Sequence, residues 1–143
     1  MKPKLAPLMT SNSEEWSTPQ DLFDELNAKF SFTLDAAASD ENHKCKKYFT
    51  KADDGLIQSW KGHRTFLNPP YGRQIGDWMK KCREEQFNHG VFTVALLPAR
   101  TDTRWFHAWC KHDDVHIEFI HGRLKFGGSK NSAPFPSMLV YFL

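Results

Sequence analysis

The chain has 143 residues, of which 40% are hydrophobic and 25% are charged, and its formal net charge is +2. These values are typical of an ordinary soluble domain, so they argue against fibrous, disordered and membrane-spanning proteins. The longest apolar run, residues 138–143, is too short to cross a bilayer. The start of the chain has no apolar stretch long enough for a secretory signal. We therefore expect a cytoplasmic protein with no membrane partner.

The length predicts a single domain over residues 14–143, after a flexible lead-in at residues 1–13 that holds Pro, Ser and Asn without periodicity. The positive excess lies in the second half of the chain, which permits an anionic partner without requiring one. The three cysteines form no C-x-x-C pair, so a disulfide framework is not expected. The histidines near Cys110 fit no zinc spacing, and we expect no metal site.

The first half of the chain begins with a helical pattern after Pro19, a residue that suits the first turn of a helix. Its apolar stripe consists of Leu22, Phe23, Leu26 and Phe30. A short strand is expected at residues 32–34, leading directly into Asp35. Residues 39–63 are polar and irregular, and they end in turn signals around Gly55.

The second half alternates strands and helices more clearly. Strands are expected at residues 65–67, 91–97, 115–120 and 137–143, with helical spacing at residues 75–82 and around residues 105–109. Strands separated by helices favour a largely parallel sheet covered on both faces. The sequence therefore predicts an α/β fold.

The segment Asn68-Pro69-Pro70-Tyr71 follows the strand at residues 65–67. Its two prolines restrict the backbone to extended geometry, so the turn can hold an amide side chain and main-chain carbonyls outward. Ligands bind at this edge of open α/β sheets. Such acceptors can grip both hydrogens of a planar exocyclic amine and make its lone pair available for attack. The alternative is a rigid loop without chemistry.

Several segments together resemble the phage-type DNA N-6-adenine methyltransferase (Dam) family, in the family's order. They are EEWSTPQDLFDELNAKFSFTLDAAAS, DDGLIQSW, FLNPPYG, LLPARTDTRWFH, GRLKF and APFPSML. The resemblance implies a compact class I, Rossmann-like fold that depends on S-adenosylmethionine. It also implies methyl transfer to the exocyclic amine of a flipped adenine in DNA. In this reading Asn68 and the Pro69 carbonyl hold the amine, Pro70 shapes the turn and Tyr71 stacks on the base.

The resemblance extends to the cofactor side of the site. The segment from Trp16 to Pro19 is similar to one that contacts the methionine end of the cofactor, which implies contacts from Trp16, Thr18 and Pro19. Here the alternative is that Ser17 or Thr18 caps the following helix.

Two further segments are implied to contact the cofactor. Asp35, Ala36 and Ala37 stand where related enzymes have a glycine-rich loop, although this chain has no G-x-G there. Asp35 either bonds the cofactor's amino group or orders the loop. Asp53, slightly preferred over its neighbour Asp54, is a candidate for the ribose hydroxyls, and a plain surface turn is the alternative.

DNA contacts are expected from basic residues in two loops, namely Arg100, Arg104, Arg123 and Lys125. Asp102 or Thr103 is expected to cap the helix that follows the first loop. The intervals between motifs leave no room for a separate target-recognition domain, so we expect a short or loose sequence preference read by loops such as residues 122–131. A monomer and a homodimer both remain open. The alternatives to a DNA enzyme are the same chemistry on an RNA base or a protein glutamine, and a catalytically silent DNA-binding relative.

Overall fold

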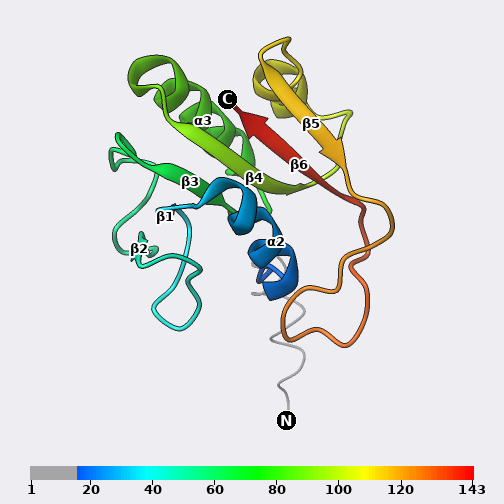
Figure 1. Ribbon diagram of the computed structural model, residues 1–143. Helices are drawn as coiled ribbons and strands as arrows, with labels where there is room; N and C mark the ends of the chain where they lie inside the picture. The colour runs from blue at the N-terminus through cyan, green and yellow to red at the C-terminus, as the bar shows by residue number, and fades with distance from the viewer. Residues whose placement is uncertain (1–15) are drawn as a thin grey trace.

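The computed structural model describes residues 16–143, so the lead-in expected at residues 1–13 lies outside the described part (Figure 1). Two α-helices, α2 (Gln20–Phe30) and α3 (Ile75–His89), accompany a short π-helix, η2 (Phe106–Cys110). The strands are β1 (Leu34–Asp35), β2 (Lys47–Tyr48), β3 (Arg64–Leu67), β4 (Phe92–Pro98), β5 (Val115–Phe119) and β6 (Ser137–Phe142). None of the helices within residues 16–143 is long and apolar enough to span a membrane.

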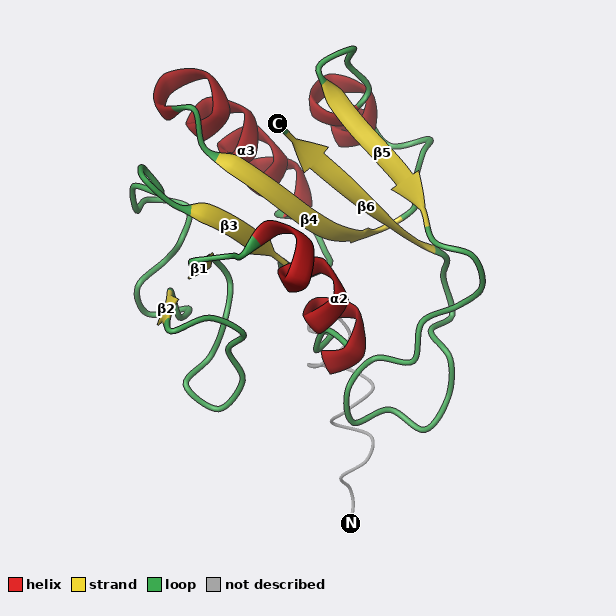
Figure 2. Cartoon of the chain, viewed as in Figure 1, coloured by secondary structure: helices red, strands yellow, loops and turns green. Residues whose placement is uncertain are grey.

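The strands form one mixed sheet in the order β2-β1-β3-β4-β6-β5 (Figure 2). The pairs from β2 to β4 are parallel, whereas β6 is antiparallel to both of its neighbours, β4 and β5. Five strands therefore run in one direction, and β6 alone runs in the other. The expected mostly parallel α/β sheet is confirmed, and the reversal of β6 follows from the loop at residues 120–136, which joins β5 to β6 without a crossover helix.

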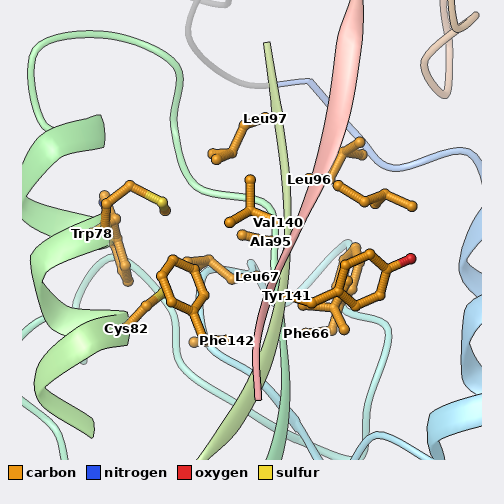
Figure 3. Packing of buried hydrophobic residues seen from close by; sticks show 14 of the residues in the cluster. Phe66, Leu67, Trp78, Cys82, Ala95, Leu96, Leu97, Val140, Tyr141 and Phe142 are labelled. Carbon is orange, nitrogen blue, oxygen red and sulfur yellow. The ribbon is translucent and has the colours of Figure 1, made fainter. Parts of the chain in front are cut away.

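Helices cover both faces of the sheet, as expected. Figure 3 shows Trp78 and Cys82 of α3 on one side with Phe142, and Phe66 and Tyr141 on the other. The opposite face receives α2, whose Phe23 packs edge-on against Phe66 at 5.2 Å between ring centroids. Alternate residues of β3 and β6 thus serve two cores, because successive side chains in a strand point to opposite faces.

The first helix begins later than its proline suggests. Pro19 occupies the N-cap position of α2 rather than its first turn, and its carbonyl accepts the N–H of Phe23 at 3.1 Å. The strand expected at residues 32–34 is displaced to Leu34–Asp35, because the N–H of Thr33 is bonded to the Arg64 carbonyl at the start of the parallel pairing. The helix expected around residues 105–109 is observed as η2; its N-cap is Trp105, without a side-chain cap, although the Thr103 hydroxyl accepts the N–H of Phe106 at 3.4 Å just before it.

Topology gathers the loops of interest at one edge of the sheet. The carboxyl ends of β1, β3 and β4 meet there because these strands are parallel. The amino end of β6 also lies there, since Ser137 pairs with Pro98 at the end of β4. The turn at Asn68, the loop after β4 and the loop at residues 120–136 therefore all leave the sheet from the same edge.

The irregular segment before β3 is fixed by a buried tryptophan. Trp60 is fully buried, its indole N–H donates to the Gly55 carbonyl at 3.0 Å, and its backbone N–H donates to Glu85 of α3 at 2.9 Å. Gly55 in turn packs against the loop after β1, where a Cβ would lie 2.2 Å from the Ala36 carbonyl oxygen. The backbone at Gly55 therefore lies directly against the backbone at Ala36, at the edge of the sheet where β1 ends.

We predict that Gly55→Ala destabilises the protein by about 3 kcal/mol, because the added methyl group meets backbone that cannot move aside without shifting the loop after β1. Urea unfolding measures the change in the free energy of unfolding. Gly76→Ala is the matched control: its Cβ would lie 3.3 Å from the Trp105 side chain, a far smaller conflict than at Gly55, and it is expected to destabilise the protein less than Gly55→Ala does. Equal stability of the Gly55 variant and the wild type would contradict the close approach.

Candidate active site

Asn68 lies directly after β3, and hydrogen bonds from its side-chain amide fix its position. The amide nitrogen donates one hydrogen bond to the Trp16 carbonyl and another to the Thr18 hydroxyl at 2.9 Å. Its carbonyl oxygen, Oδ1, is buried and accepts no hydrogen bond from any residue in the range 16–143. A buried acceptor without a donor is costly in a folded protein and is uncommon. The Asn68 side chain therefore presents an acceptor that the described protein does not use.

A hollow of about 720 Å³ lies beside this turn, at the carboxyl ends of the parallel strands. Its size falls within the range of small-molecule sites. The wall is formed by residues 16–18, 35–42, 50–52, 54–56 and 68–70, together with Lys44, Phe66, Gln74 and Trp78. The indole nitrogen of Trp78 is a second buried polar atom without a partner among the described residues. Two residues that line the hollow, Asn68 and Trp78, thus each carry a buried polar atom without a partner among the described residues.

The segment before α2 forms one side of the hollow. Trp16 and Thr18 line it, whereas Pro19 does not. The alternative that Ser17 or Thr18 caps α2 is wrong, because the helix has no side-chain cap. The two hydroxyls face the interior instead: that of Ser17 accepts a hydrogen bond from Asn42 at 2.8 Å, and that of Thr18 accepts one from Asn68.

Asp35, Ala36 and Ala37 line the hollow where β1 ends, as the sequence predicted. The Asp35 carboxylate accepts the backbone N–H of Lys44 at 2.9 Å, so it orders the loop that returns toward β2. It is only 4% exposed, and burial raises its pKa to about 6, although the backbone N–H groups of Lys44 and Ala37 oppose the shift. The loop-ordering role is therefore present, and a cofactor contact by the same carboxyl remains a prediction.

The two neighbouring acids of the next loop have different environments. Asp53 does not line the hollow, because its carboxylate accepts the N–H and the hydroxyl of Thr50 at 2.9 and 3.1 Å, bonds that lower its pKa. Asp54 lines the hollow and adopts a left-handed φ of 58°. Of the two acids only Asp54 lines the hollow, and its carboxylate already accepts the Leu56 N–H at 3.1 Å, so a ribose contact by either acid remains a prediction.

Tyr71 has a more buried position than a stacking platform would have. It is 3% exposed, and its hydroxyl donates to the Leu96 carbonyl at 3.0 Å. Phe126 and Phe135, from the loop at residues 120–136, pack edge-on against its ring at 6.3 and 5.7 Å between centroids, and both also contact Trp16. Stacking of a base on Tyr71 remains a prediction, and it requires these rings to move.

The basic residues expected at the DNA surface lie in loops at this same edge. Arg100 and Arg104 follow β4, while Arg123 and Lys125 belong to the loop that precedes β6, and all four are exposed. Arg123 also donates to the Ala133 carbonyl at 3.4 Å, which ties the two ends of its loop together. The loop lies beside the start of α2 (Figure 1), where the Gly127 N–H donates to the Ser17 carbonyl at 2.9 Å.

Comparison with known proteins identifies the family to which this chain belongs. A model of the family described as DNA N-6-adenine-methyltransferase (Dam) matches residues 6–141. The chain belongs to this family. The family is one of adenine-specific DNA methyltransferases, so the chain has the sequence and the α/β fold of a methyltransferase.

Two curated relatives carry the same name. The DNA N-6-adenine-methyltransferase of Escherichia phage T1 is 39% identical over 93 residues, a match that covers 64% of this chain and 38% of that protein. The DNA N-6-adenine-methyltransferase of Haemophilus phage HP1 is 26% identical over 139 residues, which covers 92% of this chain and 80% of that protein. This Dam-family chain thus spans well under half of the T1 relative and most of the HP1 relative.

Sequence reasoning missed many residues of the Dam-family hollow, of which Asn42, Lys44 and Trp78 are examples. Asn42 and Lys44 come from an irregular segment without periodicity, and nothing in the sequence indicates that the Asp35 carboxylate folds this segment back over β1. Trp78 belongs to the apolar stripe of α3, as the spacing predicts, but it also lines the hollow. An aromatic residue with a polar atom on a core stripe is the one signal that pointed to it.

We predict that Asp35→Asn changes the pH dependence of stability. Because burial raises the pKa of Asp35 from 3.8 to about 6, the folded state binds its proton more tightly, and the carboxyl destabilises the fold increasingly as the pH rises between these values. Relative to the wild type, the variant gains up to about 3 kcal/mol between pH 4 and pH 7. Urea unfolding at both pH values measures this gain, and an unchanged difference would contradict the raised pKa.

Proposed function

We propose that this chain transfers a methyl group from S-adenosylmethionine to the exocyclic amine of an adenine flipped out of DNA. The observation that carries the proposal is the buried, unpartnered Oδ1 of Asn68 beside a hollow of about 720 Å³. Family membership supports the adenine substrate. The methyltransferase unit in this proposal covers residues 14–143, works as a monomer or a homodimer, and acts in the cytoplasm of a bacterial host.

Asn68 supplies the acceptor for the amine. The lone pair of an adenine amine is delocalised into the ring and attacks poorly. When Oδ1 of Asn68 and the Pro69 carbonyl accept its two N–H groups, the nitrogen becomes more tetrahedral and its lone pair becomes available. Because Oδ1 has no other donor, this bond costs no existing interaction of the described protein. No strong base is required, since the amine's proton can leave for solvent after transfer.

The hollow suits the cofactor by its size and by its polar atoms. When bound, S-adenosylmethionine supplies a methyl group made electrophilic by its sulfonium. Asp54 and Asp35 place carboxylates at the wall, where they suit ribose hydroxyls and an amino group respectively. The small side chains of Ala36 and Ala37 allow close approach of the backbone. Trp16 and Thr18 close the side nearest to Asn68.

The base reaches Asn68 through a rearrangement of the loop at residues 120–136. Phe126 and Phe135 cover Tyr71 in the described conformation, so the flipped base takes their place against the tyrosine ring. The same loop carries Arg123 and Lys125, which are exposed and suited to phosphate contacts. Binding of the DNA backbone by these residues therefore draws the loop away from Tyr71. Sequence preference in this proposal is short or loose, because loops read the duplex.

We predict that Asn68→Ala slows methyl transfer by at least about a hundred-fold, because the amine loses its acceptor, and leaves the affinity for S-adenosylmethionine within a few-fold. Single-turnover transfer of a labelled methyl group to DNA, and calorimetry with the cofactor, measure the two effects. Asn88→Ala, an exposed residue at the end of α3, is the matched control and keeps the wild-type rate. Full turnover by the Asn68 variant would refute the role.

The substrate itself is tested by offering the wild-type chain DNA, RNA and protein in parallel. Mass spectrometry of the digested products is expected to find N6-methyladenine in DNA. Methylation of RNA or of a protein glutamine without methylation of DNA would overturn the choice of substrate while leaving the chemistry intact. Cofactor binding without transfer to any of them would indicate a silent relative.

We predict that replacing Arg100, Arg104, Arg123 or Lys125 by alanine weakens DNA binding about equally on different sequences. Each lost phosphate contact lowers the slope of log affinity against log salt concentration by about 1. Fluorescence anisotropy across a salt series measures the slope. Lys80→Ala is the control, because Lys80 is an exposed cation on α3 paired with Glu84 at 3.6 Å. A slope unchanged in all four variants would place the duplex elsewhere.

A further inference from the structure

The amide of Asn68 has two ends of nearly equal shape and opposite chemistry. Rotation by half a turn about its last side-chain bond exchanges the acceptor, Oδ1, with the donor, Nδ2. In the function proposed above only Oδ1 can grip the amine, since Nδ2 would set its own hydrogens against those of the base. The reaction therefore depends on which end of the amide faces the amine.

The described structure fixes this orientation from behind. Nδ2 carries two hydrogens, and both are used: one is donated to the Trp16 carbonyl and one to the Thr18 hydroxyl at 2.9 Å. A carbonyl oxygen only accepts hydrogen bonds, so the end of the amide that faces Trp16 must be the nitrogen. Oδ1 is then left on the other side, buried and without a partner among residues 16–143.

Thr18 is itself held firmly enough to act in this way. It is 4% exposed and stands two residues before the first residue of α2. Its neighbour Ser17 is bonded on two sides: the carbonyl accepts the Gly127 N–H at 2.9 Å, and the hydroxyl accepts a hydrogen bond from Asn42 at 2.8 Å. Two separate parts of the chain, at Gly127 and Asn42, thus hold Ser17, the residue directly before Thr18.

We propose that Thr18 is a positioning residue for Asn68: its hydroxyl, with the Trp16 carbonyl, holds the amide so that Oδ1 faces the amine of the substrate. This inference rests on the proposed function. It gives Thr18 a role different from the cofactor contact that the resemblance implied, because the hydroxyl oxygen is directed to Asn68. A residue that acts in this way affects the rate of transfer more than the binding of the cofactor.

The test compares two substitutions of the full-length chain. Thr18→Val keeps the shape and removes the hydroxyl, whereas Thr18→Ser keeps the hydroxyl. With saturating S-adenosylmethionine, Thr18→Val is expected to slow single-turnover transfer to DNA about ten-fold, which corresponds to the loss of one hydrogen bond. Its cofactor affinity stays within about three-fold of wild type, and Thr18→Ser retains the wild-type rate. If the valine variant does not fold, Thr18→Ala takes its place.

Thr33→Val is the matched control. Thr33 is an exposed threonine whose hydroxyl bonds to His63 at 2.9 Å and to the backbone of Arg64, away from the hollow, and its replacement leaves the transfer rate unchanged. Two outcomes overturn the proposal. In one, Thr18→Val weakens cofactor binding and transfers at the wild-type rate when saturated, which makes Thr18 a cofactor contact. In the other, the serine variant is as slow as the valine variant.

A measurement without turnover separates this proposal from the proposed function. The side-chain amide signal of Asn68, identified in NMR spectra by its loss in Asn68→Ala, is expected to exchange its hydrogens with solvent faster in Thr18→Val than in wild type or Thr18→Ser. Equal exchange in all three proteins would overturn the positioning role. Absence of methyl transfer by the wild type, with the exchange difference present, would overturn the proposed function and leave the positioning of the amide standing.

Discussion

The hydrogen bonds from the Asn68 amide to the segment before α2 are the interaction on which the site depends. They join residues about 50 positions apart in sequence and bring the turn after β3 against Trp16 and Thr18. The same bonds use both hydrogens of the amide, so its oxygen is left over at the edge of the hollow. One side chain thereby closes the hollow and supplies its unused acceptor. An apolar residue at position 68 would lose the acceptor and both of these hydrogen bonds.

The sheet explains why this interaction can form at the right place. Five strands run in one direction, and the segments that follow three of them, β1, β2 and β3, line the hollow. The reversed strand, β6, begins at the same edge, so the loop at residues 120–136 returns across the site with Phe126 and Phe135. The parallel part of the sheet builds the hollow, and the reversed strand follows the loop whose Phe126 and Phe135 cover Tyr71.

The sequence predicted the local elements well because their signals are local. The apolar stripes of α2 and α3 and the buried run of β4 are visible as periodicity, and the turn at Asn68 follows from its two prolines. The direction of β6 leaves no such signal, since a buried strand reads alike in either direction. The existence of β2, in a segment expected to be irregular, and the position of β1 also escaped prediction, because two-residue strands depend on pairing rather than on pattern. The short π-helix shows the same limit, since its apolar spacing indicates a helix without its extent.

Some side-chain roles could not be predicted from the sequence, because they depend on contacts that only the folded structure shows. Asp53 and Asp54 differ by one position, and only the bonds from Thr50 decide which of them faces the hollow. The aromatic cover on Tyr71 comes from more than 50 residues away.

The Trp16 carbonyl also has a consequence for the chemistry permitted at position 68. A carboxylate there would set oxygen against the Trp16 carbonyl oxygen, so this backbone path favours an amide over an acid at position 68.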